Sequence, residues 1–132
     1  MNAKEHRIDG RIRYRYPTPI ASPYRFSQIA RTPVVRLGHV LGTIDQTVRF
    51  LCWLLLADYL SHAGTDQRSD EVEKQLLELP TFNTAQAMEL LKALVSAANS
   101  ESCFIPEILN AMESSPGQRL EALVKQMGHI II

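Results

Sequence analysis

The run Arg11-Ile12-Arg13-Tyr14-Arg15-Tyr16 carries the residue types best suited to binding phosphate or carboxylate groups. In an extended chain its strict alternation places the arginines on one side and Ile12 with the tyrosines on the other. Basic side chains interleaved with aromatic rings are typical of segments that hold phosphates and stack on bases. Three interpretations stay open for Arg11, Arg13, Tyr14, Arg15 and Tyr16: pairing within the chain or solvation, an acidic protein partner, or nucleic acid.

The formal net charge of the 132 residues is zero, but the charges are unevenly distributed. Residues 1–36 hold eight Lys or Arg against two acids, and residues 37–132 hold six against twelve. Such asymmetry between segments indicates either docking of one on the other or an acidic partner for the basic one.

Asp58 and His62 are the best pair for metal binding, because a spacing of four residues puts both on one helical face. Two ligands do not complete a site. His39 lies several turns away, Cys52 points elsewhere on the helical wheel, and the sequence has neither Cys-x-x-Cys nor His-Glu-x-x-His. We therefore expect no metal and no cofactor.

Catalytic motifs are equally absent from the sequence. There is no Gly-x-Ser-x-Gly, and Gly38 and Gly42 are isolated in a helical pattern rather than part of a phosphate loop. Cys52 lies in an apolar run and Cys103 beside Phe104, which indicates reduced core cysteines. We expect a protein that is not an enzyme and, with no apolar signal segment at the amino terminus, a cytoplasmic one.

A long helix is predicted at residues 36–62. The apolar positions 37, 40, 41, 44, 48, 51, 52, 55 and 59 fall on one stripe about 100° wide, as expected for a helix facing a core. In the second half, Phe50, Trp53, Leu54 and Ala57 fall on the opposite side. They are either additional core or a surface for a partner or a second copy, and Phe50, Trp53 and Ala57 are the candidate contacts.

A membrane span is not expected from this helix. Its uncharged apolar run, Phe50 to Ala57, has eight residues, whereas a spanning helix needs about 20. Arg49 and Asp58 flank the run directly.

The remaining segments complete an all-α prediction. Pro17, Pro19 and Pro23 favour an extended basic arm over residues 1–34. Residues 35–132 are expected to form a bundle of about five helices around the long one, with later helices starting near Ser69, Asn83, Ile105 and Ser115. The apolar ending Ile130-Ile131-Ile132 suggests a short buried strand, an intermolecular contact or a longer protein.

The order of features from Tyr16 to Leu60 resembles helical amino-terminal modules of some large bacterial signalling and conflict proteins. A proline-containing entry, PIASPYRF, precedes a helix like VRFLCWLLLADYL and a later segment like TFNTAQAMELLKAL. Some such modules are similar to the HEPN class of helical domains, whose nucleases carry an Arg followed within a few residues by a His. Here nine residues separate Arg119 from His129, and Lys125 is of the wrong type, so the resemblance implies a non-catalytic member used for association or regulation.

The sequence therefore favours a regulatory or adaptor domain that acts through protein–protein contact, including contact with a second copy. One alternative is binding of RNA or single-stranded nucleic acid by the Arg/Tyr segment. Another is a structural homo-oligomer in which the basic arm of one subunit lies on the acidic face of the next.

Overall fold

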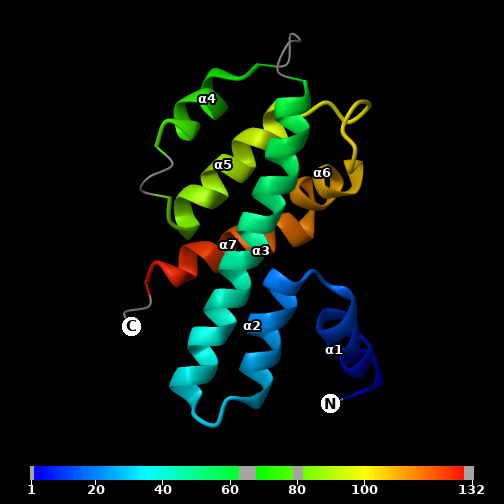
Figure 1. Cartoon of the computed structure of the whole chain (residues 1–132), viewed down its shortest axis with the longest axis vertical. Coiled ribbons are helices and arrows are strands. Elements are labelled where there is room, and N and C mark those ends of the chain that lie inside the picture. The colour runs from blue at the N-terminus through cyan, green and yellow to red at the C-terminus, as the bar shows by residue number, and fades with distance from the viewer. Residues whose placement is uncertain (1, 63–67, 79–81, 130–132) are drawn as a thin grey trace. The chain divides into compact units, whose positions relative to one another are not determined.

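The computed structural model describes residues 2–62, 68–78 and 82–129, and within them the chain is helical without strands (Figure 1). The described helices are α1 (Ala3–Arg15), α2 (Thr18–Ile29), α3 (Pro33–Ser61), α4 (Asp70–Leu76), α5 (Thr84–Ala97), α6 (Pro106–Glu113) and α7 (Ser115–Met127). The predicted all-α class is confirmed. The strand considered for residues 130–132 lies outside the described residues.

The extended conformation predicted for residues 1–34 is wrong, because both α1 and α2 lie in this segment. A capping box starts α1: the Asn2 side chain accepts from the Glu5 backbone N–H at 2.9 Å, and the Glu5 carboxylate accepts from the Asn2 N–H at 3.1 Å. Pro19 falls in the first turn of α2, where backbone N–H groups have no helical partner in any case. Only Pro23 lies inside the helix and removes a hydrogen bond.

The chain divides into two compact units, residues 1–47 and residues 48–132. This division does not coincide with the boundary expected after residue 34, because α3 begins in the first unit and ends in the second. The helix predicted at 36–62 is present and starts three positions earlier, at Pro33. The Thr32 hydroxyl accepts from the Val35 N–H at 3.3 Å and so caps the first turn.

The first unit consists of α1, α2 and the first half of α3. The Phe26 ring of α2 stacks on the His39 ring of α3, with centroids 5.5 Å apart. Three residues farther from the turn on each helix, a Cβ atom at Gly42 would lie 3.8 Å from the Cβ atom of Pro23, an ordinary contact distance. The two helices thus meet through Phe26, Pro23 and the glycine without strain.

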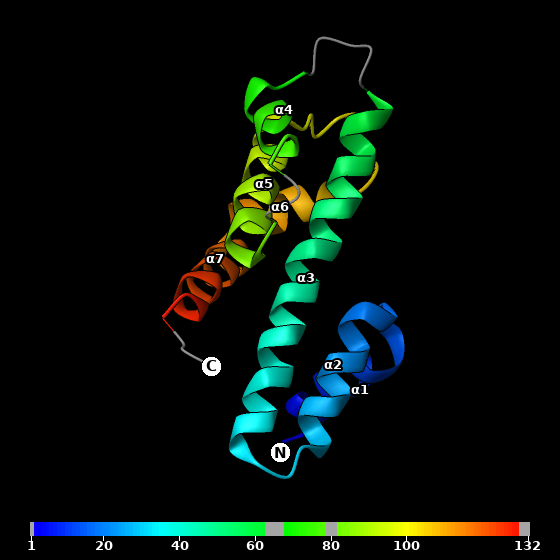
Figure 2. The ribbon, with the colours of Figure 1, turned by 60° about the vertical axis from the view of Figure 1, so that its left-hand side comes forward.

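The second unit consists of the second half of α3 and helices α4 to α7, with α4 running beside α5 (Figures 1 and 2). Apolar residues at helical spacing build its core. The buried ones are Val48, Cys52, Leu55, Leu56 and Tyr59 of α3, Val72 of α4, Ala87, Met88, Leu90, Leu91 and Leu94 of α5, Ile108 and Leu109 of α6, and Val124 of α7. Each buried Leu or Val contributes about 1.5–3 kcal/mol to stability relative to exposure.

The N-cap residues predicted for the helices of this unit agree with the structure at Ser69 and Asn83 and differ by one residue for α7. Ser69 accepts from the Val72 N–H at 3.3 Å, and Asn83 forms a capping box with Gln86. The cap predicted at Ser115 is one residue late, because Ser114 is the N-cap residue of α7. Ser114 also ends α6, and its hydroxyl donates to the Ala111 carbonyl at 3.2 Å instead of capping α7.

Candidate interaction surfaces

The Arg/Tyr segment forms a basic face on α1 rather than an extended arm. In a helix, residues three or four apart are neighbours, so Arg11 and Arg15 share a face with Lys4 and Arg7. All four are exposed, and the Tyr14 side chain beside them is 77% exposed. Arg7, Gly10, Arg11, Tyr14 and Arg15 line an open hollow of about 500 Å³. Tyr16, the C-cap residue, is also exposed.

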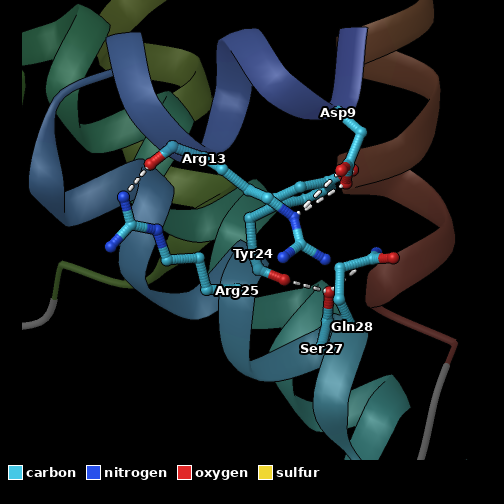
Figure 3. A network of polar contacts seen from close by, with 6 residues as sticks. All are labelled: Asp9, Arg13, Tyr24, Arg25, Ser27 and Gln28. Atoms are coloured by element: carbon cyan, nitrogen blue, oxygen red, sulfur yellow. Dashed lines mark hydrogen bonds and ion pairs between the residues drawn. The ribbon is translucent and has the colours of Figure 1, made fainter. Parts of the chain in front are cut away.

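Arg13 does not lie with Arg11 and Arg15, so the prediction that the three arginines share one side is wrong. Its Nε atom lies 3.0 Å from one Asp9 carboxylate oxygen and 3.1 Å from the other (Figure 3). The Tyr24 hydroxyl of α2 donates to the same carboxylate at 2.7 Å. Asp9 therefore joins α1 to α2, and Arg13 orients Asp9 from within the same helix.

This network shifts the ionisation of both partners. The Tyr24 hydrogen bond is the main reason why the pKa of Asp9 is lowered, and Arg13 lowers the pKa further. Burial, followed by the hydrogen bond to Asp9, raises the pKa of Tyr24 to about 12. Both shifts favour the arrangement in which Tyr24 keeps its proton and Asp9 is charged.

Arg25 completes the α1–α2 contact (Figure 3). Its guanidinium group donates to the Arg13 carbonyl in the last turn of α1 and lies 5.4 Å from the centre of the Tyr14 ring. The exposed Tyr14 ring is therefore held in place on one side by Arg25. Further along α2, the Ser27 hydroxyl donates to the Tyr24 carbonyl at 2.6 Å.

A second surface lies where α2 turns into α3; we call residues 26–37 the α2–α3 tip. Its exposed apolar residues are Phe26, Ile29, Val34, Val35 and Leu37. Arg31 and Arg36 are exposed among them. Phe26 is half-exposed, and Ile29 is 69% exposed.

A third surface is the second face of α3, and we call Phe50, Trp53, Leu54, Ala57 and Leu60 the α3 ridge. Trp53 and Leu60 are 51% and 55% exposed, and Ala57 is also exposed. Phe50 and Leu54 are half-buried. The helix thus places the candidate contacts Phe50, Trp53 and Ala57 on one face, together with Leu54, and the structure adds Leu60 to it.

Trp53 lies against Phe82, and Arg49 holds Phe82 in place. Its ring centroid lies 6.4 Å from that of Phe82, and the Arg49 guanidinium lies 5.3 Å from the Phe82 centroid on the same ring. Arg49 also donates to the Phe82 carbonyl at 3.1 Å. One part of Trp53 therefore packs within the unit, and the rest is open to solvent.

Asp58 and His62, considered above as metal ligands, contact structural partners. The Asp58 carboxylate is buried and accepts from the backbone N–H of Phe104 at 3.1 Å. The His62 Nδ1 atom lies 2.8 Å from the Asp58 carbonyl oxygen and 3.9 Å from the carboxylate. The described residues contain no group of three side chains able to hold a metal ion.

Both cysteines are free and buried. The Cys52 Sγ atom donates to the Ala87 carbonyl at 2.9 Å, and burial raises the pKa of this thiol to about 12. A thiol with that pKa is protonated at neutral pH and is a poor nucleophile. Cys52 therefore acts as a core side chain that joins α3 to α5.

Acidic residues gather between α4 and α5. A hollow of about 380 Å³ is lined there by Glu71, Glu78 and Glu89, together with Lys74 and several neutral residues. A smaller hollow of about 200 Å³ shares Glu71 and Glu89. Both hollows therefore bring carboxylates of α4 and α5 together, beside Lys74 in the larger one and Lys92 in the smaller one.

Within the described part of the chain, α3 is also the one helix long and apolar enough to cross a membrane by length and composition. Only 22% of its apolar window is buried. Asp45, Arg49 and Asp58 lie along the same helix. A core helix of a soluble protein can meet the same criteria.

No family model, curated protein or solved structure matches this chain. These comparisons therefore assign no role to the three surfaces or to the acidic hollow.

Proposed function

We propose that this chain is a non-catalytic protein–protein interaction domain that binds its partner through the α3 ridge. The observation that supports this most strongly is the exposure of Trp53, Ala57 and Leu60 along one face of the central helix. Contiguous apolar surface on a folded domain is typical of an interaction site. A second copy of the chain is one possible partner, and another helical protein is the other.

Trp53 has the properties of an interface anchor. Tryptophan is enriched among the residues that contribute most to protein–protein affinity. Because the Trp53 ring lies against Phe82, which Arg49 in turn contacts, its orientation is largely fixed before a partner arrives. Binding then costs less side-chain entropy than it would for a freely rotating residue.

The spacing of the α3 ridge fits a helical partner. Phe50, Trp53, Leu54 and Ala57 follow the i, i+3, i+4, i+7 pattern by which helices present an apolar face to a groove or to another helix. Ala57 is the small residue of the set and would allow the closest approach of a partner backbone. A substitution at Ala57 should therefore affect association directly.

The test compares Ala57→Arg with Leu77→Arg in size-exclusion chromatography with light scattering and in partner pull-downs. Ala57 and Leu77 are both exposed, so neither arginine is forced into the core. The proposal expects Ala57→Arg to abolish association and Leu77→Arg, which lies outside the α3 ridge, to preserve it.

Trp53→Ala and Phe50→Ala provide the second arm of the test. Association should weaken about 30-fold or more for Trp53→Ala if the ring is an interface anchor. If both alanine variants only lower stability, and Ala57→Arg leaves every association intact, the α3 ridge is not an interface and the proposal fails.

A second candidate function is binding of single-stranded nucleic acid by the α1 face. It is supported by exposed Arg11 and Arg15 beside exposed Tyr14. Binding to a fluorescent RNA oligonucleotide should then fall steeply with salt and be lost in the Arg11→Ala, Arg15→Ala double variant. No change in anisotropy at low salt would exclude it.

A further inference from the structure

We propose that the first unit binds anionic membrane surfaces by inserting the α2–α3 tip into the headgroup region. This activity uses residues outside the α3 ridge, so it is independent of the proposed protein–protein contact. The binding is peripheral, with α3 remaining outside the bilayer core.

The apolar side chains of the α2–α3 tip are unusually exposed for their size. Val34 is 75% exposed, Ile29 is 69% exposed, and Val35 and Phe26 are each about half-exposed. They lie at the end of the α2–α3 hairpin, where two helices turn back on each other (Figure 2). A projecting end that carries aliphatic side chains can enter a lipid interface without rearrangement of the rest of the unit.

The charge around these side chains selects an anionic surface. Residues 10–44 contain six arginines and neither Asp nor Glu. Arg31 and Arg36 lie within the α2–α3 tip itself and are exposed. Basic side chains next to inserted apolar residues are attracted to the phosphates and carboxylates of anionic headgroups.

The turn that carries this surface is held by hydrogen bonds. The Arg36 guanidinium donates to the Ala30 carbonyl at 3.3 Å, and the Arg36 backbone N–H donates to the Thr32 carbonyl at 3.0 Å. The apolar residues on both sides of this turn are therefore presented together. A fixed turn loses less entropy on insertion than a flexible loop.

Tyrosines sit beside the α2–α3 tip, as they do at membrane interfaces. A hollow of about 590 Å³ in the first unit is lined by Tyr14, Tyr16 and Arg25, and it reaches Phe26 and Ile29. Tyrosine rings favour the headgroup level, where their apolar body and polar hydroxyl are both accommodated. Nucleic acid would pair with the arginines and tyrosines but would not use the exposed Val34 and Ile29.

The test is sedimentation of the full chain with vesicles of phosphatidylcholine alone or with about one third phosphatidylserine. We expect binding to the anionic vesicles only, decreasing as salt is added. Ile29→Asp with Val34→Asp should abolish it, whereas Leu77→Asp, at an 85% exposed apolar residue of the second unit, should bind like the unmodified chain. Circular dichroism checks that both variants remain helical.

The second part of the test replaces two arginines of the α2–α3 tip. The double variant Arg31→Ala, Arg36→Ala should bind anionic vesicles about 30-fold more weakly. Arg119→Ala, an exposed arginine of α7, is the matched control and should change binding little. Equal binding of the Ile29→Asp, Val34→Asp variant and the unmodified chain would overturn the proposal, as would failure to bind anionic vesicles. Bound protein that resists alkaline carbonate extraction would also overturn it, because that result indicates a spanning α3.

Discussion

The buried carboxylate of Asp58 accepts a hydrogen bond from the backbone N–H of Phe104, 46 positions later in the chain. Phe104 directly precedes the N-cap residue of α6, so this bond fixes the segment that leads into α6 on the surface of α3. A residue whose type and spacing suggested metal binding therefore has a structural partner. Buried acceptors of this kind are costly to remove because the donor is left without a partner.

Substitution of Asp58 should distinguish the hydrogen bond from the charge. Asp58→Ala removes the acceptor and should lower the free energy of unfolding by about 1–3 kcal/mol. Asp58→Asn keeps an oxygen that can accept from Phe104 and should cost less. Urea denaturation measures both effects. Amide exchange at Phe104 should accelerate in Asp58→Ala, and unchanged exchange there would contradict the assigned role.

Gly117 is predicted to tolerate no side chain. A Cβ atom at this position would lie 2.2 Å from the Met112 carbonyl oxygen and 2.4 Å from its Cα atom, and backbone atoms cannot rotate away. Gly117→Ala should therefore force α6 and α7 apart and cost about 1–3 kcal/mol, measured by urea denaturation.

Gly38 supplies the matched control for Gly117. It lies inside α3, and a Cβ atom there would meet nothing within 4 Å. Gly38→Ala should therefore raise stability by about 0.5–1 kcal/mol, since alanine loses less backbone entropy than glycine in a helix. If both substitutions changed the free energy of unfolding in the same direction, the close approach of α6 and α7 would not explain the effect of Gly117→Ala.

The Tyr24–Asp9 pair predicts pH dependence at both ends of the scale. Because the folded pKa of Tyr24 is raised from 10.0 to about 12, its contribution to stability is complete below pH 10 and is lost as pH rises toward 12. Because the pKa of Asp9 is lowered from 3.8, its contribution is present above that value and is lost as pH falls through the folded pKa.

Tyrosine absorbance titration measures the alkaline limb of this prediction. One of the four tyrosines should ionise near pH 12, and this component should disappear in Tyr24→Phe. Asp9→Asn removes the negative partner and should move the same component to lower pH. A Tyr24 component that does not respond to Asp9→Asn would show that burial alone sets its pKa.

The central helix and its surroundings were predictable because their signals are local. The apolar spacing from Leu37 to Tyr59 defines α3, and Asn83 with Gln86 marks the start of α5. Both signals depend on residues within a few positions of one another. The resulting all-α fold is therefore evident from the sequence.

The helices of residues 1–34 were missed because two local signals compete there. The alternation of Arg and Tyr from Arg11 to Tyr16 has the period of a strand, but Asn2 followed by Glu5 is a capping-box sequence that favours a helix start. The contact of Asp9 with Tyr24 then stabilises α1 against α2. That contact joins residues 15 positions apart, and no sequence pattern specifies it.

The exposed surfaces were predictable only in part. Phe50, Trp53 and Ala57 follow from the helical wheel of α3, but support of Trp53 by Phe82 depends on the path of the chain before α5. The α2–α3 tip could have been noticed from the acid-free stretch of residues 10–44. The exposure of the α2–α3 tip could not be predicted, because Phe26 and Ile29 are of residue types that usually lie inside a fold.

The way α3 contributes to both units has a consequence for synthesis on the ribosome. The described partners of its first half, Phe26 and Pro23, precede it in the chain, whereas those of its second half, such as Phe82 and Phe104, follow it. Since translation proceeds from the amino terminus, the first unit can assemble while α4 to α7 are still being made. Until α4 to α7 have been synthesised, the apolar residues in the second half of α3 stay exposed. The nascent chain is therefore most vulnerable to aggregation at this stage.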